Sequence, residues 1–135
     1  MAEIDYAFIA DYAKVEVTGA LTVVNGSWMF LQVPVFPTAQ RLSIAGRIRS
    51  TIDAGAVHTR VVVTGPDGLY RMAVDGEIGP GPAAEPYADG RVGLLFAVDL
   101  EVPVPVPGLY MIDVVLPENA MTRHLAFEAR PAPVT

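Results

Sequence analysis

The sequence predicts an all-β fold, an immunoglobulin-like antiparallel β-sandwich of about eight or nine strands. Three observations support this prediction. Short segments alternate apolar and polar residues with a period of two, and turn signals rich in Gly, Pro, Asn and Asp separate them. No stretch keeps the 3.6-residue period of an amphipathic helix. We expect a single domain over residues 1–130, followed by a flexible C-terminal tail at 131–135.

The first third of the chain contains four segments with strand patterns. An apolar strand at 6–10 ends at a polar break, Asp11, and a short strand follows a turn and covers 21–24. Asn25-Gly26 is the strongest two-residue hairpin signal, so we expect 21–24 to pair with 28–33. Residues 42–49 alternate between aliphatic residues and Ser, Ala or Arg, which predicts a half-buried strand with its basic side chains outward.

The segment 58–78 reads as a complete β-hairpin. Gly65-Pro66-Asp67-Gly68 is a turn in which proline presets φ and glycine accepts a left-handed conformation. A four-residue loop places Thr64 opposite Leu69 and puts the apolar alternation of both strands on one face. A slip of one residue would move every side chain to the wrong face, so the pattern selects this loop.

The remaining segments continue the pattern. Residues 79–90, rich in Gly and Pro, predict a long loop, and 92–102 predict a strand with its even-numbered residues inward. The alternation of Val and Pro up to residue 107 predicts an extended crossing, because proline cannot donate to a sheet ladder. A second hairpin follows, in which 109–116 and 121–130 are joined by the loop 117–120 and Ile112 lies opposite Leu125.

Composition excludes several classes of function. The 135 residues are 52% hydrophobic, which excludes a disordered chain, yet no apolar run is long enough to span a membrane. The net charge of −6 argues against nucleic acid and anionic membrane surfaces as partners. The chain lacks cysteine, and its first residues lack the basic and apolar regions of a secretory signal, so we expect a cytoplasmic protein.

Four motifs together resemble an uncharacterised bacterial family of small β-sandwich proteins, an actinobacterial-type domain of unknown function. They are Tyr6-Ala7-Phe8-Ile9-Ala10-Asp11-Tyr12-Ala13, Gly19-Ala20-Leu21 with Asn25-Gly26, His58-Thr59-Arg60-Val61-Val62-Val63 before Pro66-Asp67-Gly68, and Pro107-Gly108-Leu109-Tyr110. The first is the most specific, and the four span nearly the whole chain. The resemblance implies the sandwich fold and implies no activity, cofactor or catalytic residue.

The two histidines each fall opposite an aspartate in the expected hairpins, His58 opposite Asp75 and His124 opposite Asp113. Two exposed cross-strand ion pairs are the simpler interpretation. The functional alternatives are acid–base dyads or, where the strands converge, a metal site. No acidic spacing predicts a calcium site, and no nucleophile motif is present, so we expect no cofactor, no metal and no enzymatic activity.

Three functions remain open. The favoured hypothesis is a non-catalytic sandwich that binds another protein, a second copy of itself included, because five apolar side chains are expected on outward faces: Val62, Leu69, Leu109, Met111 and Val115. The alternative is a module that binds a sugar or small ligand through the aromatic residues Trp28 and Tyr87. An enzyme built on the His–Asp pairs ranks last. The simplest association is a two-fold homodimer.

Overall fold

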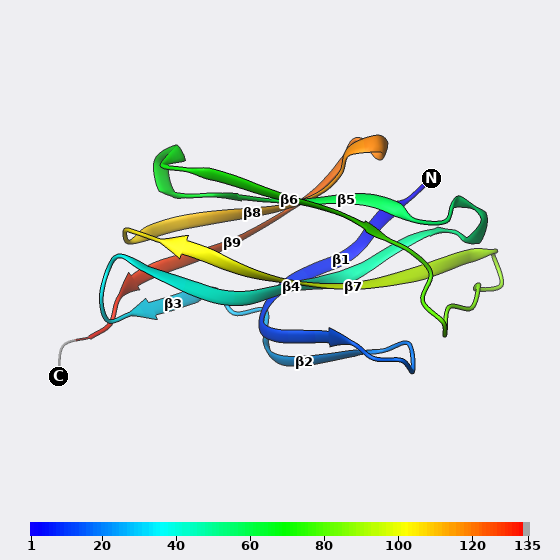
Figure 1. Cartoon of the computed structure of the whole chain (residues 1–135), viewed down its shortest axis with the longest axis horizontal. Coiled ribbons are helices and arrows are strands. Elements are labelled where there is room, and N and C mark those ends of the chain that lie inside the picture. Colours follow the sequence, from blue (N-terminus) through cyan, green and yellow to red (C-terminus); the bar gives the residue numbers. More distant parts are fainter. Residues whose placement is uncertain (134–135) are drawn as a thin grey trace.

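The computed structural model describes residues 1–133 and consists of two β-sheets packed face to face (Figure 1). The smaller sheet has the order β2 (Leu21–Gly26), β1 (Glu3–Val15), β4 (Thr38–Thr51) and β7 (Arg91–Val104). The larger has the order β3 (Phe30–Val33), β9 (Met121–Pro131), β8 (Gly108–Leu116), β5 (Val57–Thr64) and β6 (Arg71–Ile78). The all-β sandwich predicted from the alternation is confirmed. Only short 3₁₀ turns, Ile52–Ala54, Pro66–Gly68 and Pro117–Asn119, interrupt the strands of the described chain.

The core lies between the two sheets and follows the predicted alternation. The even-numbered residues of β7 from Val92 to Val102 point inward, as do Ile112 and Val114 on β8. Tyr110 and Phe127 stack across β8 and β9 with ring centroids 5.1 Å apart. Buried aliphatic and aromatic side chains of this kind supply most of the stability of a sandwich.

Tyr110 also forms the corner by which the chain enters β8. Its hydroxyl donates to the carbonyl of Val106 at 2.7 Å, four residues upstream. A tyrosine that bonds backward in this way, at the corner leading into an inner strand, is typical of immunoglobulin-like sandwiches. The motif Pro107-Gly108-Leu109-Tyr110 therefore has a structural explanation, since the turn brings the hydroxyl under the preceding loop.

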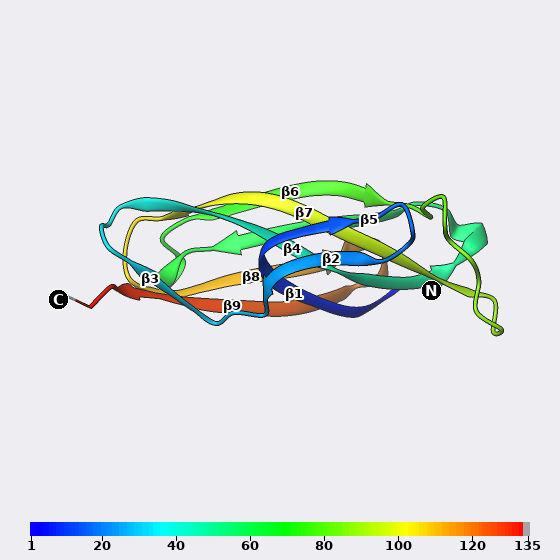
Figure 2. The same ribbon diagram turned by 90° about the horizontal axis from the view of Figure 1, so that it is seen from below.

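A two-stranded ribbon adds a partial third layer. β1 pairs with β4 only as far as Ala10, and its second half pairs with β2 alone. This ribbon lies over the outer face of the smaller sheet (Figures 1 and 2), where Ala13 and Ala45 pack together. Ser43 is consequently buried, accepting from the Ala13 amide at 3.2 Å and donating to Asp99 at 2.6 Å. The outward residues of β4 were correctly identified, but the cover above them was not predicted.

The predicted register of the central hairpin is wrong by two residues. Thr64 pairs with Arg71, not with Leu69, so the loop holds six residues, 65–70. The loop is longer because Gly65 and Tyr70 close it with a backbone hydrogen bond of 3.0 Å around a 3₁₀ turn, in which Asp67 adopts φ 54°. A shift of two preserves the faces, so Thr59, Val61 and Val63 are buried on the predicted inner face, whereas Val74, on the same face of the edge strand β6, is 39% exposed.

The second hairpin is confirmed in detail. Leu116 pairs with Met121, Ile112 with Leu125 and Asp113 with His124, across a loop of residues 117–120. Ala120 has φ 51°, the left-handed conformation that completes this turn.

The hairpin predicted at Asn25-Gly26 is wrong. β2 continues through both residues and pairs with β1, and β3 pairs in parallel with β9 in the other sheet. Asn25, with φ 49°, bonds Asp11 through its side chain at 3.1 Å, and the Ser27 amide bonds the carbonyl of Ile9 at 2.6 Å. These contacts keep the chain on β1 until it crosses between the sheets. The β3–β9 pair is the exception to the expected antiparallel pairing.

Two boundaries also differ from prediction. Pro103 lies within β7, because β7 is an edge strand and tolerates a missing amide there, so the crossing is shorter than expected. Pro131 lies within β9 and the Ala132 amide donates to Val33 at 3.0 Å, so the tail does not begin at 131. Residues 134–135 of the predicted tail lie outside the described residues. The loop 79–90 contains no strand, as predicted.

Candidate functional site

The predicted interface residues lie on the outer face of the larger sheet, but they are not equally accessible. Val62 is only 7% exposed, so it does not belong to an exposed patch. It sits on β5 between β6 and β8, where Ala73 and Asp113 flank it across the strands. Val115, beside Arg60, is half-buried for the same reason.

The other three interface residues gather at one end of this face. Leu109 and Leu69 are 53% and 56% exposed, and Met111 is half-buried. A shallow hollow of about 480 Å³ opens there between the turn 64–68 and the start of β8, and both Leu109 and Met111 line it. We call it the Leu109 hollow.

A glycine, Gly108, is among the residues that line the Leu109 hollow. Gly108 has φ +139°, and a Cβ at this position would lie 2.9 Å from Cγ of Pro66. The β5–β6 turn and the β7–β8 turn therefore pack directly on one another. A larger residue at position 108 would force the two turns apart. The shape of the hollow therefore depends on glycine at this position.

The first His–Asp pair forms in spite of the shifted register. His58 lies opposite Glu77, yet its Nε2 reaches Oδ1 of Asp75 diagonally at 2.7 Å. Arg60, the true cross-strand neighbour of Asp75, donates to the same oxygen through Nε at 2.9 Å. Glu118 lies 3.6 Å from His58 Nδ1. The hydrogen bond from His58, followed by that from Arg60, lowers the pKa of Asp75.

The second pair forms in the predicted register. His124 Nδ1 lies 2.7 Å from Oδ1 of Asp113, and the histidine is largely exposed. Within residues 1–133, no three His, Cys, Asp or Glu side chains gather closely enough to hold a metal ion. Both are hydrogen-bonded pairs between neighbouring strands on the outer face of the larger sheet, the kind of contact that stabilises paired strands.

A second hollow lies on the other side of the molecule. It has a volume of about 240 Å³ and is enclosed by the β1–β2 turn, the loop 79–90 and the outer face of β4 and β7. Tyr87 lines it, together with apolar Val15, Val17 and Leu95 and with polar Arg47, Glu16 and Glu85. We call it the Tyr87 hollow. Trp28 lies elsewhere, edge-on to Phe127 at 5.3 Å in the core, so the two predicted ligand aromatics do not share a cavity.

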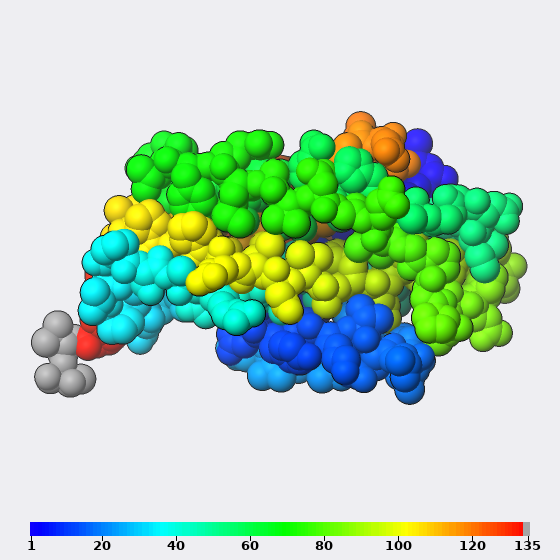
Figure 3. Space-filling view, in the orientation of Figure 1, coloured from blue at the N-terminus to red at the C-terminus, as the bar shows by residue number. Residues whose placement is uncertain are grey.

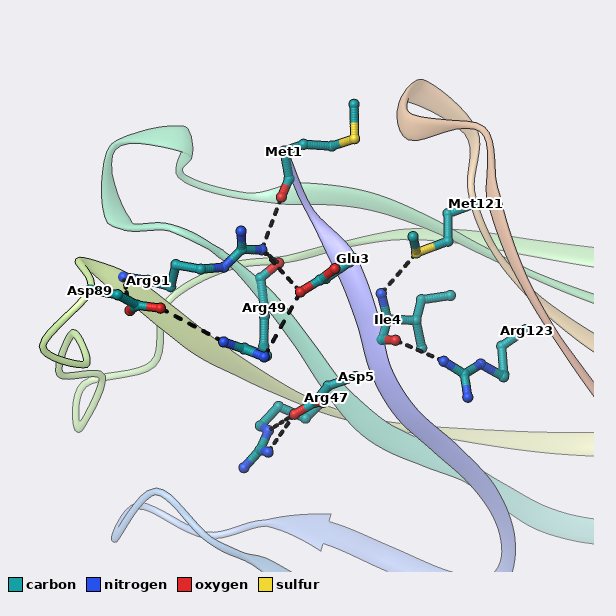
Figure 4. A network of polar contacts seen from close by, with 10 residues as sticks. All are labelled: Met1, Glu3, Ile4, Asp5, Arg47, Arg49, Asp89, Arg91, Met121 and Arg123. Atoms are coloured by element: carbon teal, nitrogen blue, oxygen red, sulfur yellow. Dashed lines mark hydrogen bonds and ion pairs between the residues drawn. The ribbon is translucent and has the colours of Figure 1, made fainter.

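An arginine network borders the Tyr87 hollow and fixes the N-terminal strand (Figure 4). Arg47 donates from Nε to Asp5 at 2.7 Å and stacks 5.1 Å from the ring centroid of Tyr6. The hydrogen bond to Asp5 raises the pKa of Arg47 against the opposing effect of burial. Arg49 lies 3.9 Å from Glu3, so the network ties β1 to β4.

The residues that shape both hollows have little signal in the sequence. Gly93 leaves space beside Arg47, since a Cβ there would lie 3.1 Å from Cδ of Arg47. Its only sequence signal is that a glycine interrupts an otherwise apolar alternation. Pro66 and Gly108 belong to recognisable turn motifs, but their contact joins turns that are far apart in sequence.

No helix in residues 1–133 is long and apolar enough to cross a membrane.

Comparison with known proteins assigns no relative. The resemblance to an actinobacterial-type domain of unknown function stays a prediction. No protein-family model matches the chain, and no curated protein matches it significantly.

Proposed function

We propose that this protein is a non-catalytic interaction module that binds another protein through the Leu109 hollow. The observation that supports the proposal is the pair of leucines, each more than half exposed, beside a hollow lined by Met111. Large apolar side chains that cluster on a surface commonly mark an interaction site. The absence of cysteine is in keeping with a reducing compartment, and we propose a cytoplasmic location.

The surroundings of the hollow suggest the chemistry of the partner. Asp67 lines it, and Glu128 lies opposite Leu109 across β8 and β9. The whole chain carries a net charge of −6. A partner with an apolar side chain to place in the hollow and basic residues around it complements this surface, because interfaces combine an apolar centre with a polar rim.

Substitution of Leu109 by Glu tests the proposal. We expect Leu109→Glu to reduce the binding of an apolar fluorescent dye and to abolish capture of the partner from cells that produce the protein. The captured partner is then purified, and its affinity for both forms is measured by calorimetry. Val24→Glu is the matched control, because Val24 is 51% exposed but lies on β2. A partner bound equally by wild type and Leu109→Glu would refute the proposal.

A second candidate function is the binding of a small hydroxylated molecule, such as a monosaccharide, in the Tyr87 hollow. The observation that favours it is the placement of a 48% exposed tyrosine beside the polar side chains of Arg47, Glu16 and Glu85. An apolar wall with a few polar groups is the usual composition of a ligand site. Calorimetric titration with a panel of monosaccharides, repeated with Tyr87→Ala, tests it. Equal heats for both forms would rule out this role for Tyr87.

A further inference from the structure

The free edge of β7 carries a continuous row of open backbone groups. In an antiparallel ladder, alternate residues bond the partner strand and those between them point away. The Arg91 carbonyl accepts from the Tyr87 amide at 2.7 Å, and the Pro103 carbonyl accepts from the Tyr70 hydroxyl at 2.6 Å. Both acceptors therefore point toward the free edge. The backbone N–H and C=O groups of the odd-numbered residues of β7 thus point away from β4 and toward this edge. Between these two closed ends, five residues present both N–H and C=O: Gly93, Leu95, Ala97, Asp99 and Glu101.

This edge is less protected than both edges of the larger sheet, and with 14 residues it is longer than β2, the six-residue strand at the opposite edge of its own sheet. β3 has only four residues, and the outward positions of β6 carry the charges of Arg71, Asp75 and Glu77. Short length and charge are two ways in which proteins prevent edge pairing. The middle of the β7 edge, from Gly93 to Ala97, has no charge, and the strand lies uncovered along the face seen in Figure 3.

We propose that two copies of this chain associate by antiparallel pairing of their β7 edges, with the two-fold axis at Ala97. This inference names a second copy as one partner of the interaction module, at a surface separate from the Leu109 hollow. It places Gly93 opposite Glu101 of the second copy and Leu95 opposite Asp99 of the second copy. A two-fold arrangement closes the assembly, since the same edge is used by both copies. The two smaller sheets then form one continuous sheet of eight strands, four from each copy.

Charge and length select this register. Arg49 lies beside Gly93 on β4, and Arg91 begins β7, so Glu101 of the second copy approaches two arginines that share Glu3 as their partner within one copy. An axis at Asp99 would place two carboxylates opposite one another, which is unfavourable. An axis at Leu95 would require the Arg91 edge, where Tyr87 already occupies the carbonyl. Only the axis at Ala97 uses all five open residues.

Sedimentation of the full chain tests the association. We expect wild type to form dimers and Glu101→Arg to weaken the dimer by about tenfold or more, because it brings arginines together. Glu101→Pro should also weaken it, since it removes an outward amide that β4 does not use. Glu118→Arg is the control, with the same change of charge in the exposed β8–β9 turn. Circular dichroism must show the same strand content in all forms.

A cross-link tests the register. The chain has no cysteine, so Ala97→Cys introduces a single thiol. Residues opposite one another in a hydrogen-bonded pair have Cα atoms about 5.5 Å apart, within the range of a disulfide. A mild oxidant should therefore convert Ala97→Cys to a covalent dimer and leave Ala73→Cys, on the β6 edge, largely uncrosslinked.

The outcomes separate this inference from the proposed function. A monomeric wild type, or equal cross-linking of the two cysteine variants, would overturn the β7 pairing. Leu109→Glu should remain dimeric, because the hollow lies on the other sheet. Glu101→Arg should still bind the captured partner. Loss of partner binding in Leu109→Glu, with its dimer unchanged, would therefore support the proposed function separately from the β7 pairing.

Discussion

Removal of one hydroxyl group, in Tyr110→Phe, tests the corner that leads into β8. Tyr110 is fully buried, and its ring stacks on Phe127, a contact that phenylalanine keeps. The substitution removes the 2.7 Å hydrogen bond to the Val106 carbonyl. An intramolecular hydrogen bond contributes about 0.5–1.5 kcal/mol, and a buried acceptor left unpaired adds about 1–3 kcal/mol. Val106 is 37% exposed, so water can partly replace the lost donor. We expect a loss of about 1–2 kcal/mol in the free energy of unfolding.

Urea unfolding followed by fluorescence measures this change, with the slope unaltered if only stability changes. Tyr70→Phe provides the control, since the half-buried Tyr70 donates its hydroxyl to the Pro103 carbonyl at 2.6 Å through a hydrogen bond that is open to solvent. Water replaces an exposed hydrogen bond readily, so the control should cost less than about 0.5 kcal/mol. A Tyr110→Phe protein as stable as wild type, or less affected than Tyr70→Phe, would refute the structural role of the corner.

Three further predictions concern the glycine at 46 and the titrating side chains. Gly46→Ala should destabilise the protein by more than about 3 kcal/mol in urea unfolding, because its Cβ would lie closer than contact distance to the backbone carbonyl of Tyr6; stability within error of wild type would contradict this packing. Because the pKa of Asp75 is lowered in the folded state, its contribution to the free energy of unfolding is present above the unfolded pKa of ~3.9 and is lost as pH falls through the folded value. Asp75→Asn should therefore flatten the acid side of a plot of stability against pH and leave the alkaline side unchanged. Burial, with a smaller contribution from Tyr110, raises the pKa of Tyr70 to about 12. The free energy of unfolding should therefore fall as pH rises from about 10 to about 12. A spectrophotometric titration should show one late-titrating phenol fewer in Tyr70→Phe than in wild type, and an unchanged number would contradict this prediction.

Local signals predicted most of the fold because alternation and turns act over a few residues. The second hairpin was predicted to the residue, since its faces and its loop length agree. The Asn25-Gly26 prediction failed because a side-chain contact to Asp11 and an amide contact to Ile9, both distant in sequence, replaced the local turn.

The candidate site was predictable only in part for the same reason. Alternation shows which side a residue faces, so both His–Asp pairs and the outward Leu109 were identified. It does not show what neighbouring strands cover, so Val62 was wrongly expected to be exposed. The hollows arise where two turns meet, as at Gly108 and Pro66, and such meetings leave no periodic signal in a single sequence.

The ribbon formed by β2 and the second half of β1 has a consequence for local unfolding. Beyond Ala10 it has no strand pairing with β4, and its buried contacts involve mainly small alanine side chains. Little apolar area is lost when it detaches, while the sandwich core between the sheets stays intact. The amides of Ala13 and Thr22 should therefore exchange with deuterium through a low-energy opening, well before those of Ile44 or Ile112. One strand, β1, thus belongs to two cooperative units, with the division at Ala10.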